Sequence, residues 1–144
     1  MSAARLAARV AELLGPASGA VVVVAAPPLA AALASRVALA GDGRPAWGAV
    51  VSFLGEPVRP ADRQRALHAL RARVGEGGPV VVVDHNQPRA VWRRALAFGP
   101  LLVAGLRPAR ARYPAARELA ALGFAVERLR LAAGERVQLV RARA

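Results

Sequence analysis

The stretch Gly77-Gly78-Pro79-Val80-Val81-Val82-Val83-Asp84-His85-Asn86-Gln87-Pro88-Arg89 decides the fold of this chain. Four consecutive valines follow a Gly-Gly-Pro turn, and a polar cluster comes directly after them. The apolar run is short and β-branched throughout, so it predicts a strand that is buried on both faces. In open α/β sheets ligands bind at the carboxyl ends of the strands. We therefore expect the functional site at Asp84, His85 and Asn86.

The composition predicts one α/β domain covering residues 1–144. Apolar residues make up 56% of the chain, enough for a sizeable core. The absence of cysteine excludes disulfides, thiolate metal sites and a cysteine nucleophile, and two histidines are too few to predict a metal site. Residues 13–35 carry no charge, but Pro27-Pro28 interrupts them, so they predict a strand, a turn and a helix rather than a membrane span. A cytoplasmic protein is expected.

The charge is strongly basic, at +12, and every basic residue is an arginine. Such a surface attracts nucleic acid, phosphorylated ligands or anionic lipid. The alternative is a solvated basic surface that reflects a GC-rich genome. The best candidates for a nucleic-acid or phosphate site are Arg107, Arg110 and Arg112, because they gather beside Tyr113 in one predicted loop. The same loop is also compatible with simple solvation of its charges.

Hydrophobic periodicity and turn signals divide the chain into alternating elements. Helices are predicted over residues 2–14, 29–39, 60–74, 88–98 and 113–123, and strands over 20–26, 49–54, 80–83, 124–131 and 136–140. The alternation up to residue 83 requires parallel strands with right-handed crossovers. The last two strands are joined by a tight link and predict an antiparallel hairpin. The expected fold class is α/β: a three-layer sandwich with a mostly parallel sheet of about five strands and an antiparallel C-terminal hairpin.

Several segments, in this order, resemble the class I S-adenosylmethionine-dependent methyltransferases, especially the small-molecule branch of ubiquinone/menaquinone type. They are Arg5-Leu6-Ala7-Ala8-Arg9-Val10, Pro28-Leu29-Ala30-Ala31-Ala32-Leu33, Trp47-Gly48-Ala49-Val50-Val51, Gly77 to Asp84, and Gly134-Glu135-Arg136-Val137-Gln138-Leu139-Val140. The resemblance covers nearly the whole chain. It implies a Rossmann-like fold, S-adenosylmethionine as cofactor and a small-molecule substrate.

This chain departs from the family in the segments that would bind the cofactor. The family's first strand ends in a glycine-rich loop, and nothing before Arg5 supplies such a strand or loop. Its second strand ends in an acid that binds the ribose hydroxyls, and Ala25 and Ala26 stand in that place, where neither side chain accepts a hydrogen bond. We therefore expect this chain alone to bind S-adenosylmethionine weakly. If the first strand is lost, the sheet order becomes second, fourth, fifth, last and next-to-last strand in family terms.

The expected substrate site joins Asp84, His85 and Asn86 to Ser52 and Glu56, which flank the end of the neighbouring strand. A carboxylate, an imidazole and an amide there can orient or deprotonate a methyl acceptor. The alternatives are that Asp84 and Asn86 cap the next helix and that Glu56 is a solvated loop residue.

Three functions follow from these observations. The first is a methyltransferase that is impaired in catalysis. The second is a non-catalytic partner subunit, in a homodimer or heterodimer, that presents an exposed apolar edge. The third is a basic nucleic-acid-binding domain.

Overall fold

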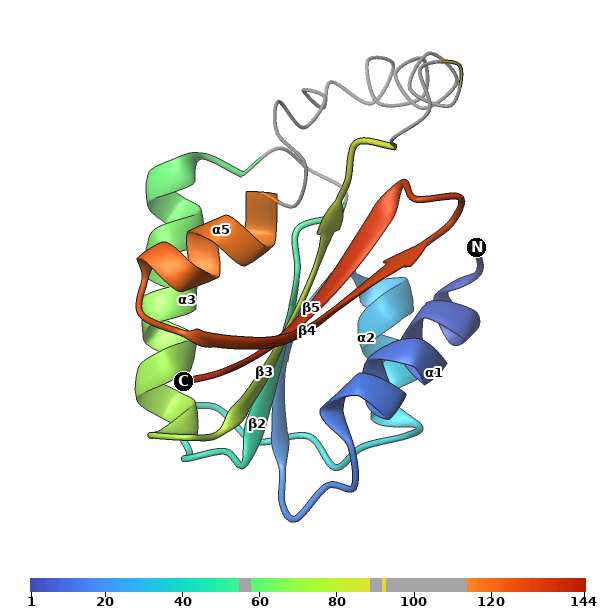
Figure 1. The fold of residues 1–144 in the computed structure, drawn as a ribbon. Coiled ribbons are helices and arrows are strands. Elements are labelled where there is room, and N and C mark those ends of the chain that lie inside the picture. The colour runs from blue at the N-terminus through green and yellow to red at the C-terminus, as the bar shows by residue number, and fades with distance from the viewer. Residues whose placement is uncertain (55–57, 89–91, 93–113) are drawn as a thin grey trace.

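The computed structural model describes residues 1–54, 58–88, 92 and 114–144 (Figure 1). Four helices and five strands have defined bounds. The helices are α1 (Ala3–Leu14), α2 (Pro27–Ala34), α3 (Pro60–Val74) and α5 (Pro114–Ala121). The strands are β1 (Val21–Val24), β2 (Gly48–Ser52), β3 (Pro79–His85), β4 (Ala125–Ala132) and β5 (Val137–Arg143).

The strands form one sheet in the order β1-β2-β3-β5-β4. The first three strands are parallel, and β5 runs antiparallel to both β3 and β4. Because β5 inserts between β3 and β4, the hairpin closes the sheet with its second strand innermost. The expected fold class is confirmed, and the five strands of this chain pair in the spatial order that was expected.

Helices cover both faces of the sheet, which gives the three layers visible in Figure 1. Alternate valines of β3 supply the two cores: Val80 and Val82 face α3 and α5, while Val81 and Val83 face α1 and α2. All four are fully buried, as the continuous valine run predicts for a central parallel strand. The helix side chains packed against them include Leu67 and Leu119 on one side and Leu13 and Leu33 on the other.

Three elements differ most from the expectation at their ends. Strand β5, expected to end at Val140, continues to Arg143 because it pairs with β3 as far as Pro79. The helix expected to reach Leu39 already ends at Ala34, and Leu39 instead forms a parallel bridge to Val21 on the outer edge of β1. This bridge satisfies backbone groups that an edge strand otherwise exposes, which outweighs the weak helical preference of residues 35–39. The strand expected to end at Val83 continues through His85, because β5 supplies hydrogen-bonding partners as far as Val137.

The other boundaries agree closely with the sequence. Ser2 caps α1, with its Oγ accepting a hydrogen bond from the Arg5 amide at 3.4 Å. Helix α3 begins at Pro60 and ends at Val74, before Gly75. The helix expected over 88–98 lies outside the described residues, apart from positions 88 and 92. Within the described part of the chain, no helix combines the length and the apolar character that crossing a membrane requires.

Candidate functional site

The carboxyl ends of β2 and β3 bring most of the expected substrate residues to one edge of the sheet. Ser52 is the last residue of β2 and lies opposite Val83 in register, so it stands beside the approach to Asp84. Asp84 and His85 are the last two residues of β3, and Asn86 follows. Glu56, Arg107, Arg110 and Arg112 lie outside the described residues.

Asp84 is buried at the end of β3, in an ion cluster that the sequence analysis missed. Its Oδ2 accepts a hydrogen bond from Arg63 Nη2 at 2.7 Å, and its Oδ1 accepts one from the His85 amide at 2.7 Å. The same Arg63 Nη2 donates to Glu118 Oε2 at 2.6 Å, and Arg63 Nε lies 3.1 Å from that oxygen. The guanidinium also stacks over the ring of Phe53, 3.9 Å from its centroid. Helices α3 and α5, strand β3 and the residue that follows β2 therefore meet at Arg63.

Burial shifts the pKa values within this cluster. Burial raises the pKa of the Asp84 carboxyl above its ordinary value, and the charge and hydrogen bond of Arg63 only partly oppose this. Burial acts to lower the pKa of Arg63, but its hydrogen bonds and charge interactions with Glu118 and Asp84 outweigh that effect and raise it. The guanidinium thus stays charged and holds two carboxylates. Asp84 is already engaged through both of its oxygens.

His85 is fixed through its backbone, whereas its ring Nε2 has no partner among the described residues. Its backbone carbonyl accepts a hydrogen bond from Gln138 Nε2 at 2.8 Å, which fixes the end of β3 to β5. Its Nε2 is buried and has no hydrogen-bond partner among the described residues. Burial lowers the pKa of the imidazole, against the opposing charge of Asp84, so the ring is biased toward its neutral form. A neutral imidazole with an unused nitrogen is the chemical form that accepts a proton.

Asn86 and Ser52 make local structural contacts. Asn86 Nδ2 donates to the Glu135 carbonyl at 2.8 Å, and the Asn86 amide donates to the Arg136 carbonyl at 2.9 Å. These bonds fasten the end of β3 to the turn of the β4–β5 hairpin. Ser52 Oγ accepts a hydrogen bond from the Leu54 amide at 3.3 Å. Both side chains therefore stabilise the backbone at this edge of the sheet.

The carboxyl end of β1 shows how far the edge suits S-adenosylmethionine. The chain passes from Val24 through Ala25 and Ala26 into α2, whose first two residues are Pro27 and Pro28. Proline has no amide hydrogen, so two donors that a helix N-terminus normally offers to a ligand are missing. The amides of Leu29 and Ala30, the next two residues, both donate to the Ala26 carbonyl. This turn offers neither a side-chain acceptor nor its usual backbone donors to a cofactor.

Known proteins resemble this chain in backbone structure, whereas two comparisons of its sequence find no match. No family model matches the sequence, and no curated protein matches it. Solved structures do resemble its backbone, among them the following three. The pyocyanin biosynthetic protein PhzM has a TM-score of 0.61 and 22% identity, over 85% of this chain and 42% of PhzM. An O-methyltransferase family protein from Burkholderia thailandensis has a TM-score of 0.63 and 13% identity, over 96% and 55% of the two chains.

The methyltransferase CalO6 is the third, with a TM-score of 0.61 and 18% identity over 95% of this chain and 52% of CalO6. The chain thus spans about half the length of these neighbours, or somewhat less. Nearly all of it nevertheless takes part in the match. Its backbone therefore has the Rossmann-like fold that these three structures share.

Proposed function

We propose that this chain is an S-adenosylmethionine-dependent methyltransferase-like protein whose cofactor binding is impaired. The observation that carries the proposal is the backbone match to methyltransferases over 85–96% of the chain. The polar residues Asp84, His85, Asn86 and Ser52 stand at the edge where such a sheet binds its ligands. A cytoplasmic location and a small-molecule acceptor belong to the same proposal. LepI, a further structural neighbour, was solved in complex with S-adenosylmethionine.

The impairment rests on the turn after β1. If β1 corresponds to the family's second strand, Ala25 and Ala26 replace the ribose-binding acid. If β1 corresponds to the first strand, its pairing with β2 is explained without the loss of any strand between them. In that case Ala25 to Pro28 replace the glycine-rich loop. Both assignments remove hydrogen bonds to the cofactor. Leaving two or three ligand polar groups unpaired costs about 1–3 kcal/mol each, which weakens binding by roughly two or more orders of magnitude.

The roles of the remaining residues follow from their surroundings. His85 is the residue best suited to accept a proton from a methyl acceptor, because its imidazole is biased toward the neutral form and its Nε2 is unused within the described residues. Asp84 contributes indirectly: it fixes the His85 backbone amide and is itself held by Arg63. We assign Asn86, Ser52 and Glu56 to the walls of the substrate site.

Titration calorimetry with S-adenosylmethionine and its demethylated product tests the proposal without a known acceptor. We expect dissociation constants weaker than about 100 μM. The variant Pro28→Ala restores one amide donor and should tighten binding about 3- to 10-fold, the value of one hydrogen bond. Pro60→Ala makes the same change at the start of α3 and should leave the affinity unchanged.

Each outcome of the titration decides a separate part of the proposal. Micromolar affinity in the wild-type chain would show that binding is not impaired and would leave the methyltransferase assignment standing. No saturable binding at 10 mM ligand, in the wild type and in Pro28→Ala alike, would remove the cofactor from the proposal altogether.

A second candidate function, a non-catalytic subunit that pairs with another chain, is favoured by the outer edge of β1. This strand is an end strand of the sheet, and among the described residues only Val21 has a bridging partner on its outer side. Val24 is 48% exposed and Leu39 is 49% exposed, so apolar surface accompanies the open edge. Sedimentation equilibrium of the wild type and of Val24→Arg would test self-association. A monomer at all concentrations in both proteins would exclude the homodimer.

A further inference from the structure

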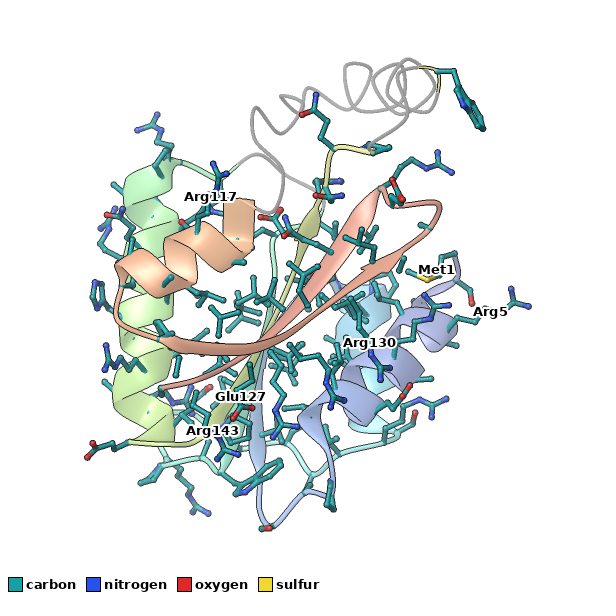
Figure 2. The ribbon with its side chains drawn as sticks, viewed as in Figure 1. Met1, Arg5, Arg117, Glu127, Arg130 and Arg143 are labelled. Atoms are coloured by element: carbon teal, nitrogen blue, oxygen red, sulfur yellow. The ribbon has the colours of Figure 1, made fainter. Side chains whose placement is uncertain are left out.

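We propose that α1 and the β4–β5 hairpin form a surface that binds the phosphate backbone of nucleic acid without reading its sequence. This inference does not depend on the methyltransferase proposal, because none of the arginines that carry it belongs to the residues assigned to the substrate site. We call it the basic face. Figure 2 shows its labelled members along the side of the molecule occupied by α1 and the hairpin. Its six arginines are Arg5, Arg9, Arg128, Arg130, Arg141 and Arg143.

Strand register explains why the hairpin arginines share one face. Arg128 lies directly opposite Arg141, and Arg130 lies opposite Leu139, which belongs to the core beneath α1. A register shift between Val126 and Arg128 marks a β-bulge, which lets Glu127 join the same side. Two contacts tie this side to α1. Arg141 Nη1 donates to the Leu13 carbonyl at 2.8 Å, and Arg130 Nη1 donates to Glu12 Oε1 at 2.6 Å.

The carboxylates of these three elements leave most of the charge unbalanced. They are Glu12 on α1, paired with Arg130 at 2.6 Å, and Glu127 on β4, whose Oε2 lies 2.9 Å from Arg141 Nε and whose other oxygen contacts Arg143. Hydrogen bonds and charge from the neighbouring arginines lower the pKa values of both carboxyls, so they are charged at neutral pH. Six guanidinium groups and two carboxylates give the face a net charge of +4.

The arginines of the basic face are spaced in a way that favours an extended anion, such as a nucleic-acid strand, over a membrane surface. Like charges directly opposite each other in a ladder destabilise a sheet, yet Arg128 and Arg141 occupy such a pair. Alternate residues of a strand are roughly 7 Å apart, about the axial distance between every second phosphate of one duplex strand. A membrane is less suitable, because the apolar stripe of α1, including Leu6, Val10 and Leu13, is buried against the sheet and cannot insert into lipid.

Fluorescence anisotropy with labelled 20-nucleotide single strands and 20-base-pair duplexes, between 50 and 200 mM salt, tests the proposal. The double variant Arg5→Gln/Arg128→Gln removes two exposed charges that make no ion pair with any residue the structure describes. Each substitution should weaken binding roughly eightfold at 0.1 M salt and reduce the salt slope by about 1. The matched control Arg59→Gln/Arg65→Gln removes the same charge from exposed positions at α3, on the other side of the sheet.

The proposal holds if the basic-face variant loses affinity and salt slope while the control keeps both. Equal losses in the two variants would overturn it, because they would show attraction to total charge rather than to this face. No binding of the wild type at 50 mM salt would also overturn it. So would binding to anionic vesicles or to polyglutamate in preference to both oligonucleotides. Circular dichroism of each variant separates lost binding from lost structure.

Discussion

Replacing Arg63 by methionine removes the cation that holds two partly buried carboxylates together. The guanidinium side chain is 16% exposed, and those of Asp84 and Glu118 are 9% and 19% exposed. Breaking a buried ion pair from one side costs about 3–5 kcal/mol, since an unpaired charge stays buried. The partial exposure of the cluster favours the lower end of that range. We therefore expect the free energy of unfolding to fall by about 3 kcal/mol.

Thermal unfolding followed by circular dichroism measures this loss. For a chain of this length 1 kcal/mol corresponds to roughly 3 °C in Tm, so Arg63→Met should unfold about 10 °C below the wild type. Arg65→Met is the matched control in the same helix. Arg65 is 79% exposed, and its one ion pair within the described part of the chain is with Asp62, so its replacement should change Tm by no more than about 2 °C.

A third variant separates charge from packing. Adding Asp84→Asn and Glu118→Gln to Arg63→Met removes both orphaned carboxylates and should recover at least half of the lost stability. A loss of less than about 1 kcal/mol in Arg63→Met would refute the stabilising role of this ion cluster, and so would a neutral triple variant no more stable than Arg63→Met alone.

Two further predictions concern His85 and Gly78. Burial lowers the folded-state pKa of His85 below its ordinary 6.5, so the unfolded chain binds the proton first and stability falls as pH drops below 6.5. Denaturant titrations at pH 8 and 5.5 should show this loss in the wild type and in the exposed-site control His68→Gln. His85→Gln should lose the slope, and an unchanged slope would contradict the prediction. A Cβ at Gly78 would lie 2.1 Å from Val74 Cγ1 and 3.1 Å from two backbone oxygens, so Gly78→Ala should cost about 1–3 kcal/mol. Gly41→Ala, with no atom closer than 3.8 Å, should be neutral in the same melts, and equal losses would disprove the steric argument.

Much of the fold could be predicted because local signals and global topology agree. The valine run of β3 is buried on both faces, and Pro60 and Gly75 bound α3 where proline and glycine are expected. The link between the last two strands predicted their antiparallel pairing. The boundaries that differed most, at Ala34, His85 and Arg143, depend on hydrogen bonds to segments distant in sequence, which periodicity cannot reveal.

The candidate site was predicted only in part. The strand-end rule located Asp84 and His85 correctly at the sheet edge, but it did not reveal that Asp84 is already held by Arg63 and Glu118. A topological signal for Arg63 exists: a helix that follows a parallel strand starts at that strand's carboxyl end, so its first turns lie near the site. Glu118 carries no comparable signal, since its contact with Arg63 depends on how α5 packs.

The position of β5 in the sheet has a consequence for how the chain folds. The strand that joins β3 to β4 is the last one in the chain, and Gln138 reaches a partner 53 residues earlier. The parallel strands can nucleate among themselves, yet their open side stays without a neighbour until this late segment arrives. Long loop closure of this kind slows folding and prolongs the lifetime of exposed strand edges. Refolding at high protein concentration should therefore compete with aggregation through the edge of β3.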